Sequence, residues 1–189
     1  MRGSTTNRYK VYSLIGDNHG VVTLAMAKEI GVPAVEMRKL AHRGALERVG
    51  RGVYRIPFAP TGSIQIAAEY LAIIGEGAYI SGSTVPTLLQ IGLFNPRRLE
   101  ITTPNRYRGQ VPEKVRLKRV APEQAAKVVY YYDLPCQSVF DSLVSVLSFT
   151  DSDQFYTAIY DAEQYGYIGK LEARKLKRMV EDRDLERRY

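Results

Sequence analysis

Two short helical patterns joined by a sharp turn place the strongest constraint on how this chain can fold. Residues 24–30 carry apolar side chains at helical spacing, and the Thr23 hydroxyl can cap that helix by accepting from a first-turn N–H. Gly31 favours the left-handed conformation that ends a helix, and Pro33 is compatible with the start of another. The sequence therefore predicts helices over residues 24–30 and 34–43 with a tight connection.

The second predicted helix has an apolar face and a mostly basic face. Met37, Leu40 and Ala41 share one side at helical spacing. The residues on the other side are Val35, Glu36, Arg38, Lys39, His42 and Arg43. A short helix pair whose second member exposes basic side chains is typical of helix-turn-helix proteins, in which that member enters the DNA major groove.

A basic hairpin is predicted directly after the helix pair. Residues 45–56 alternate around Gly50 and Gly52, and glycine at such a turn tolerates positive φ. The residues expected to pack inward are Leu46, Val49, Val53 and Ile56. This order predicts a winged helix-turn-helix with Arg51 at the wing tip. There Arg51 either enters a narrow minor groove, where negative potential is concentrated, or is a turn charge facing solvent.

These positions give a set of expected DNA contacts. We expect the first residues of the second helix to face base edges in the major groove: Ala34, Val35, Arg38 and Lys39. The residues expected to hold phosphates are Thr23, His42, Arg43 and Arg55. For Lys39, His42 and Arg43 the alternative is a solvated helix face.

The charge distribution agrees with this placement. The chain has a net charge of +7. Residues 1–60 contain ten Lys and Arg and four Asp and Glu, whereas residues 61–189 contain seventeen Lys and Arg and sixteen Asp and Glu. The excess therefore lies almost wholly in the predicted helix-turn-helix part, which fits phosphate neutralisation and salt-sensitive binding.

Other classes of site have little support. A single cysteine, Cys136, excludes an intramolecular disulfide and a zinc site of several thiolates. His19 reads as a loop residue, and we expect no metal site, no cofactor and no catalytic residues. The longest apolar run, AAEYLAIIG, is too short to span a bilayer and contains Glu69, so we expect no membrane partner and a cytoplasmic protein.

The expected fold class is α+β, with a winged helix-turn-helix domain over residues 1–60 and an α/β domain ending in helices over residues 61–189. The proline-rich segment PFAPTG places the boundary near Pro60. A first helix is expected over residues 6–17, with its core contacts at Tyr9, Tyr12, Leu14 and Ile15. In the second domain we expect a helix at 64–74 capped by Ser63 and strands near 78–80, 99–102, 115–120 and VVYYYD. Helices follow from residue 137 onward.

A second basic cluster lies in the later domain. Its members include Arg97, Arg98, Arg106, Arg108, Arg116 and Lys118. It either extends the DNA footprint, binds RNA or an acidic partner, or is ordinary surface charge. The chain has fourteen tyrosines, whose rings could either stack on nucleic-acid bases or pack half-buried on strands.

Three stretches together carry a resemblance to a known family. They are the N-terminal part ending in GRGVYRIP, the central AYISGSTVPTLLQIGLFNPRRLEITTPNR, and the closing VFDSLVSVL with TAIYDAEQYGYIGKLEARKLKRMV. With these three stretches in this order, the chain resembles the AbiEi family. Members of this family are the antitoxins and autorepressors of type IV toxin-antitoxin systems, and these systems act in phage resistance. The resemblance implies a repressor that binds inverted repeats in double-stranded DNA as a monomer or weak dimer paired on the DNA. It also implies that the chain counteracts a co-encoded nucleotidyltransferase-like toxin, generally without a stable complex.

Other functions stay open beside this interpretation. Gly82 and Ser83 are similar to the Gly-Ser of nucleotidyltransferases, but no carboxylate pair follows at short spacing. A kinase or transferase that modifies the toxin, a general regulator unconnected to a toxin, and a protein-binding adaptor are the alternatives.

Overall fold

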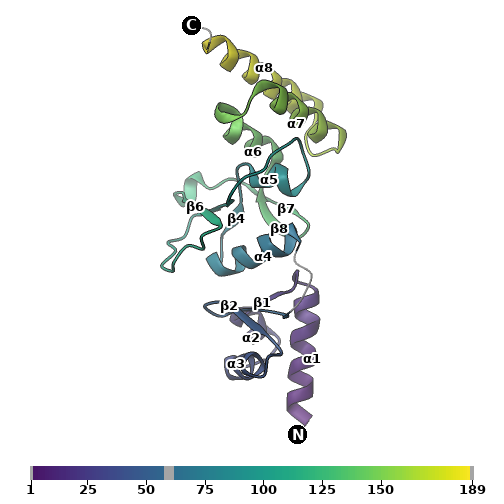
Figure 1. Cartoon of the computed structure of the whole chain (residues 1–189), viewed down its shortest axis with the longest axis vertical. Helices are drawn as coiled ribbons and strands as arrows, with labels where there is room; N and C mark the ends of the chain where they lie inside the picture. Colours follow the sequence, from purple (N-terminus) through teal and green to yellow (C-terminus); the bar gives the residue numbers. More distant parts are fainter. Residues whose placement is uncertain (1, 58–61, 188–189) are drawn as a thin grey trace. The chain divides into compact units, whose positions relative to one another are not determined.

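The computed structural model describes residues 2–57 and 62–187 and is a mixed α+β fold, with eight α-helices and two sheets in those residues (Figure 1). Its contacts divide the chain into Met1–Glu76, here unit 1, and Gly77–Tyr189, here unit 2. Pro60, at which the sequence placed the boundary, lies outside the described residues. The helix that follows it groups with unit 1, because it packs on that unit's strands.

Unit 1 combines four helices with a three-stranded antiparallel sheet. Its elements are α1 (Arg2–Gly16), β1 (Val21–Thr23), α2 (Leu24–Glu29), α3 (Ala34–His42), β2 (Glu47–Gly50), β3 (Val53–Arg55) and α4 (Ser63–Ile74). The central strand is β3, which pairs with β1 on one side and β2 on the other. The α+β class is confirmed, and the helix pair lies where the sequence predicted it.

The turn between α2 and α3 has the expected chemistry. Thr23 Oγ1 accepts from the Met26 N–H at 3.2 Å, and Gly31 has φ +74°. The Val32 N–H then donates to the Ala27 carbonyl at 2.8 Å, which closes the turn. These local bonds satisfy backbone groups that helix ends leave unpaired, so the tight connection forms from adjacent residues alone.

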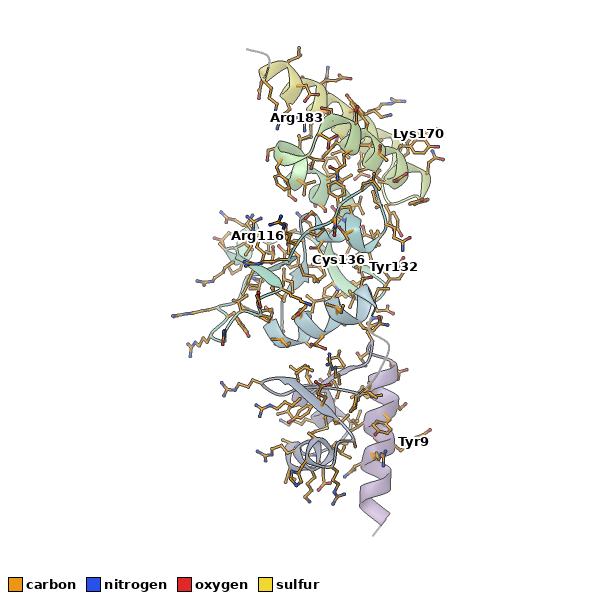
Figure 2. All side chains as sticks on the ribbon, in the orientation of Figure 1. Tyr9, Arg116, Tyr132, Cys136, Lys170 and Arg183 are labelled. Atoms are coloured by element: carbon orange, nitrogen blue, oxygen red, sulfur yellow. The ribbon has the colours of Figure 1, made fainter. Side chains whose placement is uncertain are left out.

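The core of unit 1 shows one error in the predicted packing. Val11 and Ile15 of α1 are fully buried against α3 and β3 residues that include Met37, whereas Tyr9 is 75% exposed. Figure 2 shows Tyr9 on the outer side of α1. Tyr9 lies two positions before Val11, which on a helix is nearly the opposite face, so the expected contact was wrong.

Unit 2 is built on a five-stranded mixed sheet in the order β6-β5-β4-β8-β7. The strands are β4 (Tyr79–Ile80), β5 (Leu99–Thr103), β6 (Val115–Arg119), β7 (Val128–Tyr131) and β8 (Leu134–Gln137). The helices are α5 (Thr84–Leu88), α6 (Val139–Val146), α7 (Ser152–Gln164) and α8 (Lys170–Glu186), with short 3₁₀ turns at Pro122–Gln124 and Leu147–Phe149. Within this unit, α6, α7 and α8 gather at one end of the sheet (Figure 1).

The hairpin β7–β8 differs from the single strand expected at VVYYYD. The chain turns at Tyr132 and Asp133, with φ +50° and +58°, and β8 follows. Positive φ at both central residues is the type I′ pattern, which usually carries Asn, Asp or Gly. Asp133 is one of these residues but Tyr132 is not, and no glycine follows, so the sequence signal for this turn is weak.

Helix caps and core positions of the last helices follow the sequence more closely. The Asp151 side chain caps α7 by accepting from the Gln154 N–H at 2.9 Å. Phe155 and Ile159 of α7 are fully buried, as is Leu176 of α8. In the sheet, burial raises the pKa of the Cys136 thiol to about 12, so this side chain stays a neutral core group.

Candidate nucleic-acid interface

The outer face of α3 is free of other parts of unit 1. Met37 and Leu40 are 0% and 6% exposed beneath the helix, whereas Val35 on the opposite face is 47% exposed. The other exposed residues of this segment are Ala34, Arg38, Lys39, His42 and Arg43. Burial of Met37 and Leu40 fixes the rotation of the helix, and this rotation turns the basic residues outward.

Arginines from α3 and from the hairpin β2–β3 line one groove of about 550 Å³ in unit 1. Arg38 comes from α3, Arg48 from β2 and Arg51 from the hairpin turn, and Thr23 lies in the same groove. We call this groove the basic groove and define it by these four residues. The other residues that line it are Leu24, Ala25, Gly52, Val53, Tyr54, Ala72, Gly75 and Glu76. Three cations on one concave surface create a positive potential suited to a polyanion.

Tight packing holds the hairpin in place. Gly52 has φ +74°, and a Cβ there would lie 3.3 Å from Leu24 Cδ1. Arg48 Nε donates to the Gly50 carbonyl at 3.1 Å, next to the irregularity in the β2–β3 register. The turn that carries Arg51 is therefore positioned by contacts on both of its sides.

Arg55, expected at a phosphate, lies between two carboxylates. Its guanidinium is 3.0 Å from Glu47 and 2.8 Å from Glu69, and these partners raise the pKa of Arg55. Glu69 belongs to α4, so this arginine links the hairpin to α4 within unit 1. Lys39 also has a carboxylate partner, Glu36, at 2.7 Å, but an exposed pair of this spacing contributes only about 0.2–0.5 kcal/mol.

The second basic cluster is divided by the sheet of unit 2. Arg97 and Arg98 precede β5, whereas Arg106 and Arg108 follow its far end. Arg116 and Lys118 lie on β6, and only these two line a cavity of about 480 Å³ in this unit. Figure 2 labels Arg116 on that strand. Of the six residues predicted as one patch, four therefore lie in the segments that flank β5, and two lie on β6.

Residues 9–57 match the family model of a transcriptional regulator, the AbiEi antitoxin. This segment is therefore similar to the AbiEi transcriptional regulators. The match runs from α1 through β3 and contains Thr23, Arg38, Arg48 and Arg51 of the basic groove. It confirms the first of the three stretches that carried the resemblance.

The fold of the whole chain also has a counterpart among solved structures. The crystal structure of the RV2827C protein from Mycobacterium tuberculosis aligns with a TM-score of 0.50 and 15% sequence identity, over 90% of this chain and 71% of that one. At this identity the likeness concerns the fold, which is mixed α+β. A comparison with curated proteins found no match.

Sequence reasoning missed Arg48 as a member of the groove. The available signal was its position in the predicted hairpin next to Arg51, but the register irregularity at Gly50 hides which way its side chain points. Among residues 2–57 and 62–187, no group of three or more His, Cys, Asp or Glu side chains is placed to hold a metal ion. No helix in the same ranges is long and apolar enough to cross a bilayer.

Proposed function

We propose that unit 1 binds duplex DNA as a winged helix-turn-helix, with α3 in the major groove and the hairpin β2–β3 as the wing. The basic groove carries this proposal, because Arg38, Arg48 and Arg51 reach it from two elements that a duplex would contact together. Proteins of this class place the second helix of the pair in the major groove.

The residues divide into base-reading and phosphate-holding groups. Arg38 can donate two hydrogen bonds to guanine, and Val35, at 47% exposure, can contact a thymine methyl. Ala34 and Lys39 share this end of the helix. The proposed phosphate contacts are Thr23, His42, Arg43 and Arg48, and Arg51 is proposed to enter the minor groove. Arg55 is left out, because its two carboxylate partners already neutralise its charge.

The AbiEi match supports a regulatory role for this DNA binding. We propose that the chain represses its own toxin-antitoxin operon by occupying inverted repeats, with one copy on each half-site. Unit 2 would counteract a co-encoded nucleotidyltransferase-like toxin without a stable complex. The match to a regulator family favours this function over a kinase or transferase acting on the toxin.

Binding of the purified full chain to the DNA upstream of its own coding sequence tests the proposal. Fluorescence anisotropy should give an affinity about 10³-fold or more above that for a scrambled duplex of equal composition, and the affinity should fall steeply with salt. Equal affinity for both duplexes would contradict sequence-specific repression. The antitoxin role is tested separately by growth, because co-expression of the full chain should restore growth of cells that express the neighbouring toxin gene.

A further inference from the structure

One face of the sheet in unit 2 forms a polar cavity of about 480 Å³. We call it the unit 2 cavity and define it by six residues: Ser81, Glu100, Thr102, Arg116, Lys118 and Gln137. They come from the segment after β4 and from strands β5, β6 and β8. A volume of this size falls within the range of about 300–1,000 Å³ that is usual for small-molecule sites.

Strand register brings the charged residues together. The parallel pair β5–β6 places Glu100 beside Arg116 and Thr102 beside Lys118. Because side chains alternate along a strand, these four point to one face, and the fully buried Ile101 points to the other. The sheet therefore has an apolar face and a face that carries charges and hydroxyls.

The inner wall of this cavity is polar although it is buried. Ser81 is 8% and Thr102 is 3% exposed, and their hydroxyls form a hydrogen bond of 2.8 Å. The Gly82 N–H donates to Gln137 Oε1 at 3.1 Å, which fixes the side-chain amide of Gln137 so that its nitrogen can donate to a ligand. Placing polar groups where a sheet would normally be apolar costs stability, and such departures are concentrated at functional sites.

The Glu100 carboxylate is held close to the backbone. Gly82 has φ +56°, and a Cβ on this residue would collide with Oε2 of Glu100. The contacts to the carboxylate are long, at 3.4 Å from Ser83 Oγ and 3.7 Å from Arg116 Nη1. The site thus keeps a positioned carboxylate whose oxygens can accept stronger hydrogen bonds from a ligand.

The groups around the cavity select for a ligand with separate anionic and hydrogen-bonding parts. Arg116 and Lys118 suit a phosphate, but an anion alone would be repelled by Glu100, and a neutral sugar would not require two cations. Glu100, Gln137 and the hydroxyls suit the donor and acceptor groups of a ribose or a base. Phe149, which is 65% exposed and lines the same cavity, offers a ring for base stacking.

We propose that the unit 2 cavity binds a nucleotide, with its phosphate at Arg116 and Lys118 and its nucleoside at Glu100, Gln137 and Phe149. The proposal rests on unit 2 alone and does not depend on DNA binding by unit 1. The nucleotide is either a free mononucleotide or one residue of a single-stranded RNA, and the two sources share the same recognition chemistry.

Isothermal titration of the full chain with AMP, GMP, CMP and UMP tests the mononucleotide, and a short single-stranded RNA tests the strand. We expect measurable binding of at least one of these probes. The double variant Arg116→Ala/Lys118→Ala should weaken that binding about tenfold or more, since charge-assisted hydrogen bonds are lost. Phe149→Ala should weaken it as well.

Arg106→Ala/Arg108→Ala is the matched control, because it removes equal charge from the exposed segment outside the cavity. Its nucleotide affinity should equal that of the unchanged chain, and circular dichroism should show that both double variants are folded. Tighter binding of the RNA than of the mononucleotides, with the same dependence on Arg116 and Lys118, would assign the nucleotide to a strand. Absence of binding by every probe, equal loss in the control, or equal affinity for inorganic phosphate would overturn the proposal.

Discussion

Replacing Arg38, Arg48 and Arg51 together with alanine should lower the affinity for operator DNA by about 10²–10⁴-fold, because each lost contact costs about 1–2 kcal/mol. All three side chains line the basic groove, and none of them is buried. Arg48 gives up one exposed hydrogen bond to the Gly50 carbonyl, so the three truncations should leave the fold intact. Fluorescence anisotropy with the upstream duplex measures the loss, and thermal unfolding followed by circular dichroism checks the fold.

The salt dependence of the same variant separates groove contacts from general charge. Each phosphate contact contributes about 0.9 to the slope of log affinity against log salt, so the slope should become shallower by about 1–3. The triple variant Arg174→Ala/Lys177→Ala/Arg178→Ala removes equal charge from exposed positions of α8 in unit 2 and serves as the control. If both variants show the same loss of DNA affinity and the same change in salt slope, the net charge of the chain determines binding, and the basic groove is not the interface.

Phe155→Ala should destabilise unit 2 by about 3–5 kcal/mol, which is a large share of the stability of a small domain. Phe155 is among the largest fully buried side chains and lies on the inner face of α7. Its truncation leaves a cavity that the surrounding side chains can fill only in part. The measurement is urea unfolding of the full chain followed by circular dichroism.

Tyr156→Ala provides the matched control for this change. The neighbouring Tyr156 is 37% exposed on the same helix, so its truncation should cost much less free energy of unfolding than that of Phe155. An equal loss in the two variants would show that α7 does not bury the face described here.

The helix pair could be predicted from sequence because its signals are local. Thr23 caps α2 through a bond to a residue three positions away, and Gly31 needs only its own backbone freedom to end the turn. The alternation of the apolar residues Met37 and Leu40 with basic ones determined which face of α3 points outward. Interactions between residues this close in the chain can be predicted from the sequence alone.

The features that sequence reasoning missed depend on distant partners. The sequence predicted Arg55 as a phosphate ligand, but in the structure Glu69 of α4, 14 positions further along the chain, pairs with it. The hydroxyls of Ser81 and Thr102 meet in the wall of the unit 2 cavity only because β4 and β5 pair in one register. Similarly, Arg97 and Arg106 seemed to form one patch, whereas β5 separates them. Pairing between remote strands and helices has no signature in a single sequence.

A DNA footprint at single-base resolution, comparing the unchanged full chain with Arg38→Ala, tests the central claim most directly. If α3 reads the major groove, the variant should lose preference at one base pair in each half-site, at a cost of about 1–3 kcal/mol, while the outer phosphate contacts stay protected. An unchanged footprint and unchanged base preference would contradict the placement of α3 in the major groove.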